Sequence, residues 1–151
     1  MECVVVKQPW ATLIVTGATR YIVREWRTHH RGRMAIQASR RFPRQNVELC
    51  CDEEMRAVLR DKGYDYVIQL PVQAVVGTVQ VCDCIYVTED NRASFECGDL
   101  AVRFGLMQPG RWAWVCTDPQ QLASPIPRIG RLGVFRVPDA LLPLPPGRGL
   151  G

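Results

Sequence analysis

The sequence predicts one small domain of the mostly-β or α+β class, folded as a small barrel. Its length of 151 residues is typical of a single domain whose core needs no disulfide or metal. About five or six β-type segments follow one another at uneven spacing, with two short helical segments between them. The sustained alternation of strand and helix that builds a doubly wound sheet is missing from this pattern, so the sequence argues against that architecture.

The first 38 residues predict three strands and one helix. Cys3–Lys7 contains three consecutive valines, which is typical of a buried strand. Pro9 suits the first turn of a helix, and apolar residues then recur at helical spacing as far as Gly17. Tyr21–Trp26 is rich in β-forming residues, and a turn then leads into a further strand over Met34–Ala38.

The middle of the chain predicts one helix, one long strand and one long loop. Residues 51–62 begin with acidic side chains that suit a helix N-terminus, and Gly63 ends this helix. Val72–Val87 is the longest β-type run, and Gly77 within it indicates a bulge or a barrel corner. Residues 88–110 are polar and contain glycine, which favours a loop with a short helical piece.

The last part of the chain predicts two strands joined by an extended linker. Arg111–Cys116 alternates so that Trp112 and Trp114 project from the same face. Pro125–Pro127 is predicted to be the linker, and Leu132–Val137 the final strand. We therefore expect the domain to cover residues 1–138 and a flexible Pro/Gly-rich tail to cover residues 139–151.

The charge is modest in total but unevenly distributed. The formal net charge is +4, while residues 1–44 carry +7, residues 45–99 carry −7 and the remainder carries +4. Such asymmetry favours a local electropositive surface suited to an anionic partner, and the alternative is an ordinary solvated face of arginines. We expect the outer rim of that surface to be formed by five side chains, namely Arg27, Arg31, Arg33, Arg40 and Arg41.

The composition also bears on localisation and cofactors. No apolar run approaches the roughly 18 residues needed to span a bilayer, and the N-terminus lacks a secretory signal, so we expect a cytoplasmic protein with no membrane contact. The seven cysteines are expected to be reduced thiols. Because Cys82-x-Cys84 has no second ligand pair, we expect neither a metal nor an organic cofactor.

The chain resembles the ASCH family of the PUA-like superfamily, whose members are β-barrel domains associated with RNA. The resemblance is carried in order by Gln8-Pro9-Trp10-Ala11, Gly17, Arg24-x-Trp26, Arg31-Gly32, Ile36-x-Ala38, Pro109-Gly110-Arg111-Trp112 and Gly130-x-x-Gly133. It implies a PUA-like small β-barrel with two or three short helices. The family signature is Gly-x-Lys-x-x-Glu-x-Arg, with Thr sometimes in place of Glu, and its positions here are Gly17, Thr19, Ile22 and Arg24.

Two of these signature positions have lost their titratable groups. Some members of the family are amidohydrolases of acylated cytidine and others are ribonucleases, and the resemblance implies catalysis by the lysine and its Thr/Glu neighbour. Here these residues are Thr19 and Ile22, and Gln37 stands where the family often has histidine. An isoleucine cannot transfer a proton, and a threonine hydroxyl needs a base to become a nucleophile. The sequence therefore favours binding without catalysis.

The sequence favours a basic cleft, bearing arginine and tryptophan, that binds RNA or a nucleotide. The candidate binding residues are Arg20, Arg24, Trp26, Arg27, Arg31, Gln37 and Arg111. The guanidinium of Arg24 could hold a phosphate with two parallel hydrogen bonds, and the alternative is a salt bridge to an acid of the middle segment. The tryptophans could stack on unpaired bases, although at least one of Trp112 and Trp114 is expected to be core.

Two other classes of function stay open. The first is a hydrolase of a modified nucleoside, such as an acylated cytidine, or of RNA, in which Lys7, Thr19 or one of the two histidines would stand in the cleft. The second is a protein-interaction module in which the acidic segment Glu48–Asp65 docks a basic partner.

Overall fold

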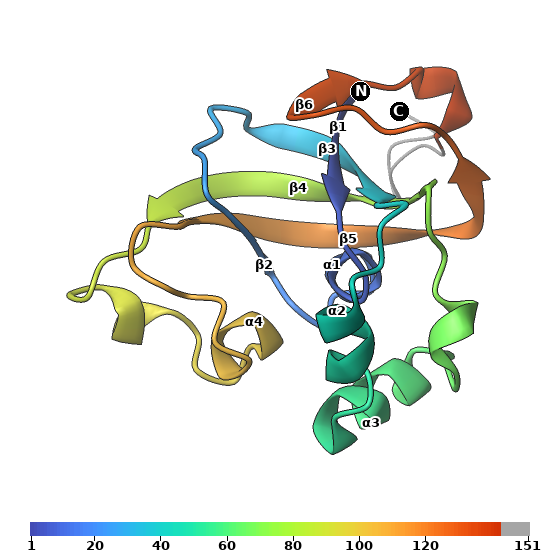
Figure 1. Cartoon of the computed structure of the whole chain (residues 1–151). Coiled ribbons are helices and arrows are strands. Elements are labelled where there is room, and N and C mark those ends of the chain that lie inside the picture. Colours follow the sequence, from blue (N-terminus) through green and yellow to red (C-terminus); the bar gives the residue numbers. More distant parts are fainter. Residues whose placement is uncertain (143–151) are drawn as a thin grey trace.

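The computed structural model describes residues 1–142 and has one six-stranded sheet at its centre (Figure 1). The strand order is β2-β5-β4-β3-β1-β6, and every pairing is antiparallel except that of β1 with β3. The strands are β1 (Glu2–Val6), β2 (Tyr21–Arg24), β3 (Gly32–Ala38), β4 (Ala74–Tyr86), β5 (Trp112–Pro127) and β6 (Val134–Arg136).

The predicted mostly-β or α+β class is confirmed, but the sheet is open. Within residues 1–142, β2 and β6 are the two edge strands and do not pair with each other. The short β6 pairs only with β1, so hydrogen bonding does not close the sheet into a complete barrel. Figure 1 shows β1 running across the direction of the long strands β4 and β5, which gives the sheet strong curvature.

Four α-helices accompany this sheet in the described part of the chain. They are α1 (Trp10–Val15), α2 (Arg44–Leu49), α3 (Glu53–Asp61) and α4 (Leu100–Arg103). α1 lies against the sheet, and α2 and α3 lie beyond it (Figure 1). The sequence did not predict α2, because this helix buries none of its side chains and therefore has no apolar periodicity.

The main core lies between α1 and the sheet. It includes Ile14 of α1, Met34 and Ile36 of β3, Val79 of β4 and Trp114 of β5, all 2% exposed or less. The expectation that one of the strand tryptophans is core is therefore met by Trp114. On the outer side of α1, Leu13 packs in a second cluster with Cys50, Met55, Leu59, Leu70 and Leu100.

Gly77 marks a bulge, as its position in the sequence predicts. The register between β4 and β5 shifts between Val75 and Gly77. A Cβ atom at Gly77 would lie 2.3 Å from the backbone oxygen of Gln120 and 2.8 Å from Cβ of Val15. Only glycine allows β5 and α1 to approach this point of β4 so closely.

The predicted linker over Pro125–Pro127 is instead the end of β5. Ile126 pairs with Val75, and Pro127 pairs with Ala74. β2 covers the other edge of β5 only from Trp112 to Val115, so the prolines lie where that edge has no neighbouring strand. A proline lacks the N–H needed for a second neighbour and is tolerated at such an edge.

The start and end of the described chain meet beside β6. The ammonium group of Met1 donates to the carbonyl of Val137 at 2.8 Å and forms an ion pair with Asp139, which begins a 3₁₀ helix over Asp139–Leu141. Residues 143–151 of the predicted flexible tail lie outside the described residues. Among residues 1–142, no helix is long and apolar enough to cross a membrane.

Candidate functional site

Two adjoining hollows, which share Lys7, Val23 and Arg24, open beside the end of β2. We call them together the Arg24 cleft. The inner hollow has a volume of about 240 Å³ and the outer one about 360 Å³. The inner hollow is also lined by Val6, Trp10, Ile14, Tyr21, Ile22, Asn46 and Leu106, and the outer one by Glu25, Trp26 and Arg111.

Arg24 is a largely buried cation with no carboxylate partner among residues 1–142. Its Nη2 atom donates to the carbonyl of Val5, and its buried Nε–H has no acceptor among residues 1–142. Burial lowers the pKa of the Arg24 guanidinium, because the charged form loses its hydration. The salt bridge considered from the sequence is therefore not found.

The remaining polar groups of the cleft come from distant parts of the chain. Lys7 follows β1 directly and is exposed, and Arg111 directly precedes β5. Arg111 is brought beside Arg24 because Arg24 pairs with Trp112 across β2 and β5. Among residues 1–142, Glu25 is the one lining residue that carries a carboxylate, whereas Lys7, Arg24 and Arg111 are cationic. Positive charge therefore predominates in the cleft.

Trp26 forms an aromatic wall at the outer end of the cleft. It is 37% exposed, and its ring stands edge-on to that of Trp114, with 4.8 Å between the ring centroids. Nε1 of Trp114 donates to the carbonyl of Trp26 at 3.3 Å, which holds this exposed residue on the core. The arrangement leaves part of the Trp26 side chain accessible to a ligand.

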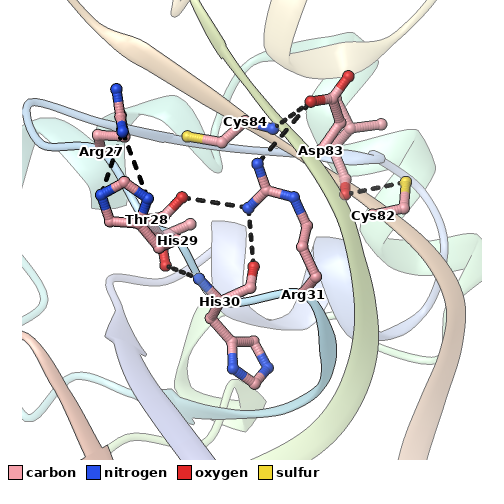
Figure 2. A network of polar contacts seen from close by, with 9 residues as sticks. Arg27, Thr28, His29, His30, Arg31, Cys82, Asp83 and Cys84 are labelled. Atoms are coloured by element: carbon pink, nitrogen blue, oxygen red, sulfur yellow. Dashed lines mark hydrogen bonds and ion pairs between the residues drawn. The ribbon is translucent and has the colours of Figure 1, made fainter.

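Arg27 lies outside the cleft, over an aromatic pair. Its guanidinium carbon is 5.7 Å from the centroid of the Trp112 ring, which contacts Tyr86 at 4.9 Å between centroids. Nη2 of Arg27 also approaches the ring of His29 at 3.2 Å (Figure 2). Part of the π-face that Trp112 could offer to a base is thus already in contact with Arg27.

Arg31 is held by its own loop. Its Nη1 atom donates to the carbonyls of Thr28 at 3.1 Å and His30 at 2.9 Å, and Nη2 lies 4.0 Å from Asp83 (Figure 2). Arg31 does not line the Arg24 cleft. The prediction that it acts together with Arg24 is therefore not supported by their placement, because loop carbonyls and Asp83 occupy its donors.

Thr19 and Arg20 lie at a separate hollow near α4. Thr19 is 2% exposed, and its hydroxyl donates to Oδ1 of Asp99 at 2.5 Å. Asp99 also accepts from the backbone N–H groups of Arg20 at 2.9 Å and Ala101 at 2.8 Å, so this carboxylate caps α4 and anchors the start of β2. A hydrogen bond to Glu96 at 3.0 Å raises the pKa of Arg20.

The two altered positions of the family signature, Thr19 and Ile22, lie in different hollows. Ile22 is 4% exposed and lines the inner hollow of the Arg24 cleft, whereas Thr19 belongs to the hollow near α4. Asp99, the partner of Thr19, was not anticipated, because 80 residues separate the two and nothing local in the sequence connects them. Of the residues considered for catalysis, Lys7 lines the cleft, whereas Thr19 and the two histidines do not.

Gln37 lies in yet another hollow, which we call the Gln37 hollow. Its volume is about 440 Å³, and its lining includes Val5, Arg40, Arg41 and Arg131. Gln37 is 1% exposed, and its Nε2 atom donates to the carbonyl of Arg128 at 2.8 Å. The predicted binding residues therefore do not converge on one cleft. Arg131 was missed, because nothing in the sequence connects residues 128–132 with β3.

The acidic middle segment pairs with cations of the same chain. Glu54 forms an ion pair with Arg103 at 2.6 Å, Glu48 with Arg44 at 3.1 Å, and Asp65 with Arg60 at 3.8 Å. These pairs reduce the charge that the segment Glu48–Asp65 can offer to a basic partner.

Comparisons with known proteins find relatives over most of the chain. No protein-family model matches it. Activating signal cointegrator 1 from Homo sapiens is 26% identical over 135 residues, or 89% of this chain, and the Mus musculus protein is 26% identical over 137 residues, or 89%. The chain spans only 22% of the length of each relative.

Solved structures agree with the fold. The crystal structure of ASCH from Zymomonas mobilis superposes with a TM-score of 0.57 at 13% identity, covering 92% of this chain and 88% of that one. A point mutant of the same bacterial protein gives a TM-score of 0.52 at 15% identity, covering 83% of this chain and 74% of that one. At such identities the likeness establishes the fold.

Proposed function

This chain has an ASCH domain, and we propose that it binds single-stranded RNA, or a nucleotide within it, in the Arg24 cleft. The observation that carries the proposal is the state of Arg24. Its guanidinium is largely buried, has no carboxylate partner among residues 1–142, and has an Nε–H without a hydrogen-bond acceptor. A buried cation without a counter-charge is costly, and an anionic ligand would relieve that cost.

A phosphate group fits this guanidinium better than a single carbonyl does. The Nε–H and one Nη–H of an arginine form a planar fork that matches two oxygens of a phosphate. Val5 occupies one Nη atom of Arg24 and leaves Nε without an acceptor. Lys7 and Arg111 line the same cleft and would add further positive charge around the phosphate.

Trp26 suits the base that accompanies such a phosphate. Proteins usually recognise RNA through unpaired bases that stack on aromatic side chains, and each stack contributes about 1–3 kcal/mol. The side chain of Trp26 is partly exposed, lines the outer hollow and is held in place by Trp114. A base at this wall with its phosphate on Arg24 would place one nucleotide across the cleft.

The proposal is tested with a double variant of exposed and half-exposed residues, Lys7→Ala with Arg111→Ala. Its control is Arg56→Ala with Arg60→Ala, which removes the same charge from α3. Binding of a fluorescein-labelled single-stranded RNA is followed by fluorescence polarisation at several salt concentrations. We expect the cleft variant to bind at least about tenfold more weakly, and the slope of log K against log salt to fall by about 1.4, or 0.7 for each lost contact.

The control variant is expected to stay within about threefold of the native affinity. Equal losses in the two double variants would show that the RNA follows net charge rather than the cleft. Native affinity in the Lys7→Ala/Arg111→Ala protein would contradict the proposal outright.

Hydrolysis of a modified nucleoside or of RNA is the second candidate, and the position of Lys7 in the Arg24 cleft favours it. Thr19 does not, since its hydroxyl is buried and donates to Asp99. Incubating the pure protein with an N-acylated cytidine or labelled RNA tests this candidate. Product that disappears in Lys7→Ala, but not in Thr19→Ser, would support a catalytic lysine.

A further inference from the structure

The Gln37 hollow lies across β1 from the contact that anchors Arg24. Val5 of β1 and Gln37 of β3 are register partners, so their side chains share one face of the sheet. Val4 and Ile36, one residue earlier on each strand, point to the core under α1. The carbonyl of Val5 accepts from Arg24 while its side chain lines the Gln37 hollow, which makes β1 the common wall of the two sites.

Gln37, which lines this hollow, also carries a side-chain acceptor that has no donor among residues 1–142. The donation from Nε2 to the carbonyl of Arg128 fixes the orientation of the amide, because the opposite orientation would bring two oxygens together. Oε1 is buried and accepts no hydrogen bond from any residue of the described range 1–142. A buried acceptor without a donor is unfavourable. A ligand that donates an N–H or O–H to Oε1 would therefore bind more tightly than one that lacks such a donor.

Three arginines surround the same hollow. Arg40, Arg41 and Arg131 are exposed, line the hollow and have no carboxylate within 4.0 Å among residues 1–142. Many other arginines, in contrast, form ion pairs with acids of this chain. The rim of the hollow is therefore a concentration of positive charge that the described fold itself does not neutralise.

The wall of the hollow is partly apolar. Ile129 is 80% exposed and Leu132 is 100% exposed, and both line it. The segment that carries them is fixed to the sheet, since Arg128 donates its N–H to the carbonyl of Gln73 at 3.1 Å. At Gly130 the segment is so close that a Cβ atom would lie 2.8 Å from Cγ2 of Val5 and 3.1 Å from Nε2 of Gln37.

We propose that the Gln37 hollow is a second nucleotide subsite. The phosphate lies among Arg40, Arg41 and Arg131, the base lies against Ile129 and Leu132, and an N–H or O–H of the base or sugar donates to Oε1 of Gln37. An inorganic anion would leave the acceptor and the apolar wall unused. The inference rests on the proposed function in taking RNA as the source of the nucleotide, but it predicts binding of a free nucleotide at a separate place.

The test is a titration of ¹⁵N-labelled protein with cytidine 5′-monophosphate, with cytidine and inorganic phosphate as matched ligands. We expect the nucleotide to shift the amide signals of Gly130 and Leu132 and the side-chain amide of Gln37. Cytidine and phosphate alone are each expected to bind at least tenfold more weakly. Shifts confined to Lys7, Trp26 and their neighbours would overturn the inference, as would phosphate binding as tightly as the nucleotide.

Two variants separate the contributions of charge and acceptor. Arg40→Ala with Arg41→Ala changes only exposed side chains and should weaken nucleotide binding at least tenfold, whereas Arg56→Ala with Arg60→Ala should not. Gln37→Leu should weaken the nucleotide and leave the binding of inorganic phosphate unchanged. If an acidic hexapeptide shifts the same signals at lower concentration than the nucleotide, the site is a peptide site and the inference fails.

Failure here is distinguishable from failure of the Arg24 cleft. In the Lys7→Ala/Arg111→Ala protein, the nucleotide should still shift Gly130 and Leu132 even when RNA affinity is lost. If RNA binding instead survives that variant and is lost in Arg40→Ala/Arg41→Ala, the Gln37 hollow stands and the Arg24 cleft falls.

Discussion

Arg24→Met separates a binding role of the buried guanidinium from an architectural one. Methionine has a similar length and no charge. The substitution removes the hydrogen bond to the carbonyl of Val5, at a cost of about 1.5–3 kcal/mol for a charged donor. It also removes the penalty of several kcal/mol for burying a cation that has no counter-charge among residues 1–142. Because these contributions oppose each other, we expect the free energy of unfolding to change by no more than about 2 kcal/mol.

If Arg24 instead belonged to a structural ion pair, Arg24→Met would lower the free energy of unfolding by more. Breaking a buried pair leaves an uncompensated charge and costs about 3–5 kcal/mol. At about 2–4 °C per kcal/mol for a chain of this size, the two cases differ clearly in the melting temperature. For binding, loss of the two-pronged phosphate contact is worth about 1.5–3 kcal/mol, which weakens RNA affinity about ten- to hundredfold.

The assay combines urea unfolding, followed by tryptophan fluorescence, with RNA binding by fluorescence polarisation. Arg33→Met is the matched control, since the Arg33 side chain is also largely buried, at 14% exposed, but pairs with Asp118 at 3.1 Å and donates to Thr78 at 2.9 Å. We expect Arg33→Met to lose stability and keep RNA affinity, the reverse of Arg24→Met. A loss of 3 kcal/mol or more in Arg24→Met with unchanged RNA affinity would refute the binding role.

Three further predictions concern the fold. Gly77→Ala should lower the free energy of unfolding by about 2 kcal/mol or more in urea, because its Cβ would lie 2.3 Å from the backbone oxygen of Gln120. Gly98→Ala is the control, since a Cβ there would have nothing within 4 Å, and its free energy of unfolding should change by no more than about 0.5 kcal/mol. Equal effects of the two substitutions would contradict the close approach at Gly77. Trp114→Ala should cost about 3–5 kcal/mol of the free energy of unfolding, since this residue is 0% exposed, and a loss below 1 kcal/mol would show that it is not core. Burial raises the pKa of Cys3 and Cys116 to about 12, so iodoacetamide at pH 8 should label exposed Cys51, Cys82 and Cys97 in the native protein but not those two, as read by peptide mass spectrometry. In the unfolded chain these thiols ionise near their ordinary pKa of about 9, whereas in the folded protein they stay neutral up to about pH 12. Their contribution to the free energy of unfolding is therefore complete below pH 9 and falls as the pH rises from 9 toward 12.

Much of the fold follows from local patterns. The valine run of β1, the proline that starts α1 and the long β-type run of β4 all predict elements that the structure contains. The errors have local causes as well. α2 has no buried side chains to give a helical period, and Pro125–Pro127 remains in β5 because its outer edge has no neighbouring strand.

The candidate site was less predictable, because charge alone does not say which cation is free. Arg20 and Arg24 lie four residues apart and look equally suited to an anion. Arg20 is paired with Glu96, 76 residues away, while Arg24 is largely buried and has no carboxylate partner among residues 1–142. Gln37, expected in the same cleft, lies across β1 in a hollow of its own.

The sequence by itself determined the class of the fold, the positions of its main strands along the chain and the concentration of arginine in the first 44 residues. These properties depend on short-range periodicity and composition, which a single chain displays directly. Only the tertiary structure decided which arginines share a hollow and which are neutralised. That outcome depends on strand pairing between β2 and β5 and on loop contacts over many tens of residues. Within the described part of the chain, these long-range contacts place a counter-charge beside Arg20 and none beside Arg24.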